Sequence, residues 1–479
     1  MNTSFQRLLL LLALYILSKP LTAQDYVVNS TFLGSKSKID LLILFGQNVD
    51  YAVDLYRITY KTLDIHNQPD TASGLLVLPQ VPHSTLLPIV VYEHGTSSGP
   101  TDVPSQLRGG YEVALAYASF GFATLAPDYL GLGDARGFHP YLHAATEASA
   151  SLDFLFAGYE FLETHDPSYD PNFLFIAGYS QGGHASAALH KLIDDYWSII
   201  IPVTAATHMS GPYSMSGVMR DKLLSDESYG SPAYLAYIIM GLNQAYPLYN
   251  DIHEIFKEPF VTDIQKFYNG TINLTTLNSQ LITELSSGGD TVAKRMLQDT
   301  VLASILANPD NRINLALKDN DLFNWAPGEP TRLYYCGADE QVPFRNSIVA
   351  DSVMNELGAP DVKSENLNPT YGHEACVFPA VLSSIQFFLS FVHGTATKEI
   401  SPATDELTFY PNPSFDMVNV DWANAKNGFT YKIFDTNGRL VNHGNTSSGN
   451  FSMSGLPEGL YMVVCSAGGE TKMGRVLRQ

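Results

Sequence analysis

The chain has few cysteines and few basic residues for its length of 479 residues. Three cysteines are too few for a disulfide scaffold, although one bridge can form and leave one thiol over. Lysine and arginine total 27 against 48 aspartates and glutamates, so the formal net charge is −21. An acidic chain of this kind repels phosphate backbones and anionic membrane surfaces. The charge balance therefore argues against nucleic acid as a partner.

Motifs that bind metals and phosphates are also missing. The sequence holds no H-E-x-x-H, no paired-cysteine motif, no phosphate-binding loop and no G-x-G-x-x-G. It has no internal repeat with a period of roughly 20 to 50 residues either. We therefore expect no metal and no other cofactor.

The chain begins with the features of a leader. Arg7 precedes a largely apolar run over residues 8–17, and small residues surround Ala23. This pattern predicts a secretory signal peptide over residues 1–23, too short for a comfortable membrane span. Its removal takes away Arg7 and Lys19 and brings the formal net charge to −23. No other apolar stretch reaches membrane-spanning length, so we expect no transmembrane segment in the mature chain.

Strand and helix patterns alternate through the middle of the chain. This alternation predicts a mostly parallel sheet with helices on both faces and ligand chemistry at the carboxyl ends of the strands. Two β-rich runs before it suit antiparallel edge strands. The expected strands are residues 53–64, 72–79, 86–95, 122–131, 173–177, 201–211 and 331–337, and the expected helices are residues 105–120, 146–164, 184–193 and 374–392.

Two segments lack this alternation of strands and helices. Residues 214–329 carry helical patterns, such as 233–246 and 290–307, without convincing strands. They predict a helical cap inserted into a domain spanning 24–398; the alternative is a packing extension with no role at the site. Residues 399–479 hold a linker and then short alternating runs separated by turn signals, which predict a small all-β sandwich.

The short stretch Gly178-Tyr179-Ser180-Gln181-Gly182 lies between an expected strand and an expected helix. It matches G-x-S-x-G, a strained turn that exposes a serine hydroxyl above a parallel sheet, and its glycines let strand and helix approach closely. The pattern alone is weak, since roughly 0.1 to 0.2 chance matches are expected in a chain this long. Whether Ser180 is a nucleophile therefore depends on finding a base and an acid elsewhere in the sequence.

A nucleophilic serine needs a base, and the base needs an acid that holds its tautomer. In this kind of sheet the chain order is nucleophile, acid, histidine. Asp339 directly follows a late strand, and His373 lies in the loop before the last helix. We therefore expect Ser180, His373 and Asp339 to form a triad. Glu340 is the alternative acid and His208 the alternative base.

An acyl-transfer site also needs donors for an oxyanion. The backbone N–H of Gln181 is the first expected donor. The second should come from the loop after the strand at 86–95, where we favour Thr96 and place Gly95 next.

Other polar and aromatic residues have open roles. His94, His139 and Tyr179 are candidates for lining the pocket, although His139 could instead fix its own loop. His184 and His190 lie on the helix after Ser180, where we expect packed or surface roles. The apolar run in the cap either forms an acyl or alcohol pocket or belongs to the cap core: Tyr237, Ile238, Ile239, Met240 and Leu242.

Taken together, the G-x-S-x-G stretch, His94-Gly95-Thr96, Asp339 and His373 resemble the α/β-hydrolase superfamily over about residues 53–393. Within it, the stretches YEHGT, PDYLGLGD, HPY, GYSQGG and WAPGEPTRLYYCGADEQVP are similar to secretory lipases and related bacterial esterases. This resemblance implies hydrolysis of carboxylic esters, with a small-molecule or lipid ester as substrate, without fixing which ester.

The tail resembles the C-terminal sorting domain of the type IX secretion system. The resemblance implies a Bacteroidetes-type bacterium, export through the periplasm and the outer-membrane secretion machinery to the cell surface or medium, and removal of the tail. It rests on FYPNP at 409–413, on Gly455-Leu456 with Gly459-Leu460-Tyr461, and on the basic end at 472–478.

The resemblance also gives two cysteines a testable meaning. Cys336 lies three residues before Asp339, and Cys376 lies three residues after His373. If the triad forms, these loops converge, and a bridge between the two cysteines would brace acid and base. Two buried free thiols remain the alternative. Cys465 is expected in a tail strand as a small hydrophobe.

The sequence thus predicts an exported serine esterase or lipase. A serine aminopeptidase on the same fold stays open, with Glu254 or Glu258 as an acidic clamp in the cap. A non-catalytic surface protein with a glycan-binding tail is a further alternative, weakly supported because Trp422 is the only tryptophan in the tail.

Overall fold

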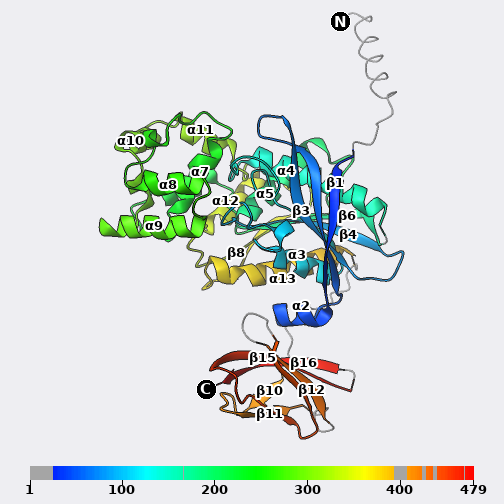
Figure 1. Ribbon diagram of the computed structural model, residues 1–479. Helices are drawn as coiled ribbons and strands as arrows, with labels where there is room; N and C mark the ends of the chain where they lie inside the picture. The colour runs from blue at the N-terminus through cyan, green and yellow to red at the C-terminus, as the bar shows by residue number, and fades with distance from the viewer. Residues whose placement is uncertain are drawn as a thin grey trace, which may run out of the picture.

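The computed structural model describes residues 25–165, 167–392, 407–422, 428–434, 440–468 and 470–478. Within these ranges a large sheet carries helices on both faces, and a smaller β domain is built from the C-terminal residues (Figure 1). The predicted signal peptide, most of the predicted linker and the Asn437-Gly438 turn lie outside the described residues.

The central sheet has nine strands in the order β1-β2-β3-β5-β4-β6-β7-β8-β9. Strands β1, β2 and β3 pair antiparallel, and β3 also pairs antiparallel with β5. The six strands β5, β4, β6, β7, β8 and β9 run parallel to one another. The predicted mostly parallel sheet is therefore confirmed, and β1 and β9 were not predicted. The strands are β1 Val27–Lys36, β2 Val53–Leu63, β3 Pro69–Pro79, β4 Leu86–Glu93, β5 Ala123–Pro127, β6 Ser168–Tyr179, β7 Ala205–Met209, β8 Thr331–Cys336 and β9 Val362–Asn368.

The parallel strands are continuous apolar runs because both of their faces are covered. In β6, Phe175 faces one core and Ile176 faces the other. Burying each large apolar side chain contributes about 1.5–3 kcal/mol. Two hydrophobic cores, one on each face, therefore hold the sheet between its helices.

Helices α3 and α13 pack on one face, where Tyr117 and Phe388 join Phe175 in a single core. Helices α4 and α5 pack on the other face, where Phe154 and Ile193 take part. Helix α12, at Arg345–Glu356, lies near α4 and α5. The covering helices are α3 Tyr111–Ser119, α4 Ala144–Glu163, α5 Gln181–Tyr196 and α13 His373–Val392, and the short α2 is Lys38–Phe45.

Helix α3 begins later than predicted. The sequence pattern suggested a helix from residue 105, but Pro104–Gln106 forms a separate 3₁₀ turn. Gly109 and Gly110 then adopt φ of 54° and 86°, in the left-handed region that ends or precedes helices rather than continuing them. The two glycines therefore separate the turn from α3.

The expectation that no other stretch reaches membrane-spanning length was wrong for α13. This helix, His373–Val392, is long and apolar enough to cross a membrane by length and composition. It nevertheless packs on the sheet through Ala380, Ile385 and Phe388, in the same core as Tyr117. Tyr117 also donates a 2.6 Å hydrogen bond to Ser384 Oγ. Its hydropathy is thus explained by its place against the sheet.

Between β7 and β8 the described chain is helical and forms the green body beside the sheet in Figure 1. The helix expected at 290–307 is divided into a 3₁₀ turn and a separate helix. The segments are η2 Met215–Met219, α6 Arg220–Leu223, α7 Ala233–Leu242, η3 Ile252–Glu254, α8 Phe260–Tyr268, α9 Leu274–Ser287, η4 Ala293–Met296, α10 Asp299–Ala307 and α11 Arg312–Asp319.

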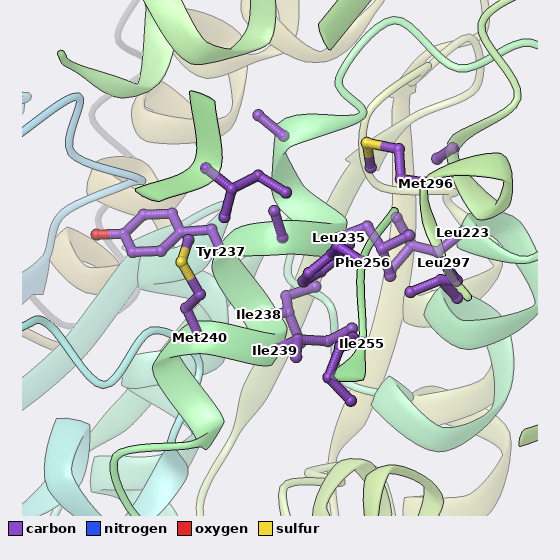
Figure 2. Close-up of a cluster of buried hydrophobic side chains, with 14 of the residues drawn as sticks. Leu223, Leu235, Tyr237, Ile238, Ile239, Met240, Ile255, Phe256, Met296 and Leu297 are labelled. Atoms are coloured by element: carbon purple, nitrogen blue, oxygen red, sulfur yellow. The ribbon is translucent and has the colours of Figure 1, made fainter. Parts of the chain in front are cut away.

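The cap has its own hydrophobic core. Figure 2 shows Ile238 and Ile239 of α7 beside Ile255, and Leu235 near Phe256. Tyr237, Met240 and Leu242 are buried in the same cluster. The apolar run of α7 therefore belongs to the cap core, and Tyr237 also lines a cavity described below.

The C-terminal domain consists of two antiparallel sheets, ordered β10-β11-β14 and β13-β12-β15-β16. Val418 and Phe451 of one sheet share a core with Ile433 and Val463 of the other, and Cys465 is buried there as a free thiol. The predicted small β domain is confirmed. Its strands are β10 Thr408–Tyr410, β11 Met417–Asp421, β12 Phe429–Phe434, β13 Leu440–Thr446, β14 Asn450–Ser452, β15 Gly459–Ala467 and β16 Glu470–Arg478.

Candidate active site

Ser180 occupies the sharp turn between β6 and α5. Its backbone has φ of 60° and ψ of −122°, a strained conformation for a residue with a side chain. The Ser180 N–H donates to Met209 O at 2.9 Å, which ties the turn to β7. A Cβ at Gly178 would collide with the backbone of Gly182, and one at Gly182 with the backbone of Glu93. Both glycines are therefore required by the close approach of strand, turn and helix.

The structure brings Ser180, His373 and Asp339 together. His373 Nε2 lies 2.8 Å from Ser180 Oγ, and His373 Nδ1 lies 2.7 Å from Asp339 Oδ2. The other oxygen of Asp339 accepts the N–H groups of Gln341 and Val342 at 3.0 and 2.8 Å. Because the carboxylate can only accept, Nδ1 carries the proton, and the lone pair of Nε2 faces the serine hydroxyl.

The two alternative residues make other contacts. Glu340 Oε2 accepts the backbone N–H of His373 at 3.0 Å, so it caps the start of α13 and contacts no atom of the imidazole. His208 is fully buried, and its ring nitrogens face Ser186 Oγ and His190. The geometry therefore favours Asp339 as acid and His373 as base.

Cys336 and Cys376 form a disulfide bond, with their Cα atoms 5.9 Å apart. Cys336 ends β8, and Cys376 lies in the first turn of α13. The bridge thus joins the two elements that carry Asp339 and His373. The alternative of two free thiols does not hold in this structure.

The expected oxyanion donors lie around Ser180. Gln181 is the first residue of α5, where a backbone N–H has no partner within its own helix. A Cβ built on Gly95 would lie 3.5 Å from Tyr179 O and 3.8 Å from Ser180 Cβ, so the loop after β4 passes directly beside the serine. Thr96 Oγ1 is hydrogen-bonded to Tyr141 Oη at 2.8 Å, which anchors this loop to the residues under the cap.

The three candidates for pocket lining are largely buried. His94 is inside the fold, with Nδ1 2.7 Å from Gly95 O and its ring stacked on Tyr129 at 4.3 Å. Tyr179 donates a 2.6 Å hydrogen bond to His373 O. His139 contacts a cavity of about 510 Å³ that Tyr237 and residues 267–273 of the cap also line. His139 thus lines this cavity, whereas His94 supports its own loop.

The side chain of Gln181 belongs to a buried polar network that the sequence did not reveal. Its Nε2 lies 2.8 Å from His139 Nε2 and 2.9 Å from Glu147 Oε1. Burial lowers the pKa of His139 to about 4, so the ring is neutral at pH 7. His139 Nδ1 then donates to Leu130 O at 2.7 Å, and Nε2 accepts from Gln181.

The network continues to the imidazole of His184, which is also buried. Glu147 Oε2 lies 2.6 Å from His184 Nδ1, and His184 Nε2 lies 2.9 Å from Asn320 O. Both ring nitrogens of His184 therefore lie within hydrogen-bonding distance of acceptors. His184 was expected to pack or to lie at the surface. Glu147 lies 37 residues before His184 in the sequence, and no local pattern pointed to the pair.

Glu93 is a second buried carboxyl group that the sequence did not single out. It ends β4 and is fully buried beneath the turn that holds Ser180. Burial raises the pKa of Glu93 to about 8, and the charge of Glu147 adds to the rise. Glu93 is therefore mostly protonated at pH 7.

The cap reaches the triad loop through a chain of hydrogen bonds. Tyr234 of α7 donates to Gln341 Oε1 at 3.0 Å, and Gln341 Nε2 donates to Glu374 Oε1 at 3.2 Å. Next to them, Tyr237 stacks on Tyr141 with ring centroids 4.1 Å apart. These contacts place α7 over the residues that adjoin Ser180.

Comparisons with known proteins agree with this architecture. A family model described as the secretion system C-terminal sorting domain matches residues 408–478. No curated protein matches the sequence. Solved structures do match, and three of them are described next.

One is the rice cell wall degrading esterase LipA from Xanthomonas oryzae, with a TM-score of 0.67 and 24% identity over 78% of this chain and 98% of that one. A putative hydrolase from Legionella pneumophila has a TM-score of 0.70 and 25% identity over 78% of this chain and 100% of that one. Candida antarctica lipase A in its closed state has a TM-score of 0.60 and 16% identity over 80% and 85%. The large domain thus has the α/β-hydrolase fold, and the C-terminal domain is a secretion sorting domain.

Proposed function

We propose that this protein is an exported serine hydrolase that cleaves carboxylic esters, with Ser180 as nucleophile, His373 as general base and Asp339 as its orienting acid. The observation that carries the proposal is the hydrogen-bond chain from Ser180 through His373 to Asp339 at a strained strand-to-helix turn. The names of two similar structures, an esterase and a lipase, support esters as the substrate class.

In the first half of the reaction, Ser180 Oγ attacks the ester carbonyl carbon while its proton passes to His373 Nε2. Asp339 stabilises the imidazolium through the Nδ1–H hydrogen bond. The oxyanion accepts the backbone N–H of Gln181 and that of Thr96, with Gly95 as the alternative to Thr96. Loss of one such donor typically costs about 3 kcal/mol of transition-state stabilisation. His373 then protonates the leaving alcohol oxygen as the carbon–oxygen bond breaks.

In the second half, a water molecule enters as the nucleophile. His373 Nε2 takes one of its protons, and the resulting hydroxide attacks the acyl carbon bound to Ser180. The tetrahedral species collapses to the carboxylic acid, and His373 returns its proton to Ser180 Oγ. The cycle needs no metal or other cofactor.

Export is the second part of the proposal. The sorting domain at 408–478 supports delivery to the cell surface or the medium through the outer-membrane secretion machinery. The predicted leader over residues 1–23 supplies the earlier step into the periplasm. The strong net negative charge suits a soluble enzyme outside the cell.

The aminopeptidase alternative receives no support from the cap. Glu254 caps a 3₁₀ turn by accepting the N–H of Asp251 at 3.2 Å, and Glu258 lies 3.4 Å from His253. Both carboxylates are exposed and make local contacts. We therefore place esters first.

The test is a chain-length series of p-nitrophenyl esters run beside aminoacyl and dipeptidyl p-nitroanilides. Ester turnover should vanish in Ser180→Ala, with a loss of up to about 10⁶-fold. Ser279→Ala, which removes an exposed serine of α9, should keep wild-type rates. Hydrolysis of the anilides without cleavage of the esters would show that the protein is a peptidase and not an esterase. Ester hydrolysis that survives Ser180→Ala would show that another residue is the nucleophile.

A further inference from the structure

A group of potential metal ligands lies at the opposite end of α5 from Ser180. His190 and Asp194 are one helical turn apart on α5, and Glu329 precedes β8, where the chain returns from the cap. His190 is fully buried, whereas the side chains of Asp194 and Glu329 are 15% and 22% exposed. One nitrogen and two carboxylate oxygens from these residues all lie within 4.8 Å of one another.

We propose that His190, Asp194 and Glu329 form a binding site for Zn²⁺. His190 Nε2 lies 3.2 Å from Glu329 Oε2 and 4.0 Å from Asp194 Oδ1. Ligand atoms at about 2.0–2.1 Å from a tetrahedral zinc ion are roughly 3.3 Å apart, so small side-chain rotations suffice. Imidazole nitrogen with two carboxylate oxygens is a ligand set that zinc accepts, and water takes the fourth position.

The neighbours of His190 show which of its two ring nitrogens donates away from the carboxylates. Ser186 Oγ donates to Gly183 O at 3.1 Å and therefore accepts from His208 Nδ1 at 2.8 Å. This leaves the lone pair of His208 Nε2 facing His190 Nδ1 at 3.3 Å, so Nδ1 is the nitrogen of His190 that donates. Nε2 of His190 is left facing the carboxylates of Glu329 and Asp194. Metal-binding histidines usually donate their second N–H in this way.

Among the described residues, the imidazole of His190 is the one ionisable basic group within ion-pair distance of the two carboxylates. In the described part of the chain, no lysine or arginine lies within ion-pair distance of Asp194 or Glu329. Asp194 Oδ2 accepts only a neutral donor outside the group, the N–H of Gly328 at 3.1 Å. A divalent cation would neutralise both carboxylates together.

The location gives the site a structural role. His190 lies ten residues after Ser180, which is about 15 Å along α5 and therefore away from the triad. An ion held by α5 and Glu329 would tie the helix that begins at Ser180 to the segment where the cap rejoins the sheet. The site is thus independent of the proposed ester hydrolysis.

The experiment uses the full chain after treatment with a chelator and dialysis. Zn²⁺ is titrated by calorimetry, and thermal unfolding is followed with and without it. We expect one Zn²⁺ per chain and a rise in Tm of about 3 °C at a hundredfold excess over Kd. Glu329→Gln and Asp194→Asn, which keep side-chain size, should each weaken binding more than tenfold while the near-UV circular dichroism stays native.

The matched control is His253→Gln, because His253 also lies beside two carboxylates, Asp251 and Glu258, but on the exposed surface of the cap. It should leave zinc binding unchanged. Wild-type binding no tighter than that of Glu329→Gln would overturn the proposal, as would loss of binding in His253→Gln. If Glu329→Gln does not fold, the zinc affinity of Asp194→Asn is compared with that of the wild type instead, and equal affinities would overturn the proposal.

Discussion

At the scale of single residues, Asp339 and Glu340 show how adjacent carboxylates acquire different roles. Asp339 Oδ2 contacts the imidazole of His373, whereas Glu340 Oε2 contacts only the backbone N–H of the same residue. A contact with the ring sets its tautomer and stabilises its cation, while a contact with the backbone only caps the helix. The two substitutions should therefore differ widely in their effect on rate.

Asp339→Asn should lower kcat for a p-nitrophenyl ester by about 10³–10⁴, because the amide can donate to Nδ1 and so favour the wrong tautomer. Glu340→Gln retains an oxygen that accepts the His373 N–H and should change kcat less than tenfold. Steady-state kinetics on both variants measures the difference. Equal losses in the two would mean that the acid was wrongly chosen.

Glu93 makes stability depend on pH in a definite direction. Its pKa is about 8 in the folded protein and near 4.5 when unfolded, so the unfolded state binds fewer protons between these values. The contribution of Glu93 to stability is fully present below pH 4.5 and is lost as the pH rises through 8. Each unit of pKa difference corresponds to about 1.4 kcal/mol.

We therefore expect Glu93→Gln to flatten the fall of unfolding free energy between pH 5 and 8, and to unfold at higher denaturant than wild type at pH 8. Urea unfolding at a series of pH values measures this. Glu356→Gln, at an exposed position on α12, is the control and should keep the wild-type slope. An unchanged slope in Glu93→Gln would show that Glu93 is not the group responsible.

At the scale of elements, the turn between β6 and α5 positions Ser180, the proposed nucleophile, by close backbone contact. Gly182 lies against the end of β4, and Gly183 lies against the end of β7, where a Cβ would come within 2.6 Å of Met209 O. Neighbouring backbone cannot move aside as a flexible side chain can. The position of Ser180 over the sheet therefore depends on residues that have no side chain.

Gly182→Ala should destabilise the protein by about 3 kcal/mol or more, because the added methyl meets the backbone of β4. Gly99→Ala is the matched control, since nothing lies within 4 Å of its Cβ position. It should shift Tm by no more than a degree or two. Thermal unfolding of the two variants measures the contrast, and similar Tm values would contradict the packing argument.

At the scale of the whole molecule, each of the two parts has its own main core, and a small buried cluster of Leu42, Phe434 and Val464 joins them. The triad lies in residues 25–392, while Val418, Ile433 and Val463 form a core within the sorting domain. No residue of 407–478 takes part in the hydrogen bonds described around Ser180. Catalysis and export are therefore expected to be separable.

A chain ending at residue 392 should keep kcat and KM for a p-nitrophenyl ester within about twofold of the full chain, because the site and its supporting cores are intact. In a bacterium with this secretion system, the shortened chain should remain in the cell, whereas the full chain reaches the surface or medium. Fractionation with an activity assay tests both. Export of the shortened chain would show that residues 393–479 are not required for export.

Much of the architecture could be read from local patterns. Chain order placed Asp339 after a late strand and His373 before the last helix, and the structure brings both to Ser180. Helix α3 was misplaced because Gly109 and Gly110 interrupt an otherwise helical pattern. Strands β1 and β9 lacked the long apolar runs that mark buried strands, since they lie at the two edges of the sheet.

The sequence by itself determined the alternation of strands and helices, the turn around Ser180, and the separate tail, because hydrophobic periodicity, glycines and turn residues act over short distances. Only the tertiary structure decided which buried polar groups meet. Glu147 pairs with His184, and His190 meets Glu329, 139 residues further along the chain, because α5 packs against segments distant in sequence. Such pairs depend on three-dimensional packing, and no local pattern encodes them.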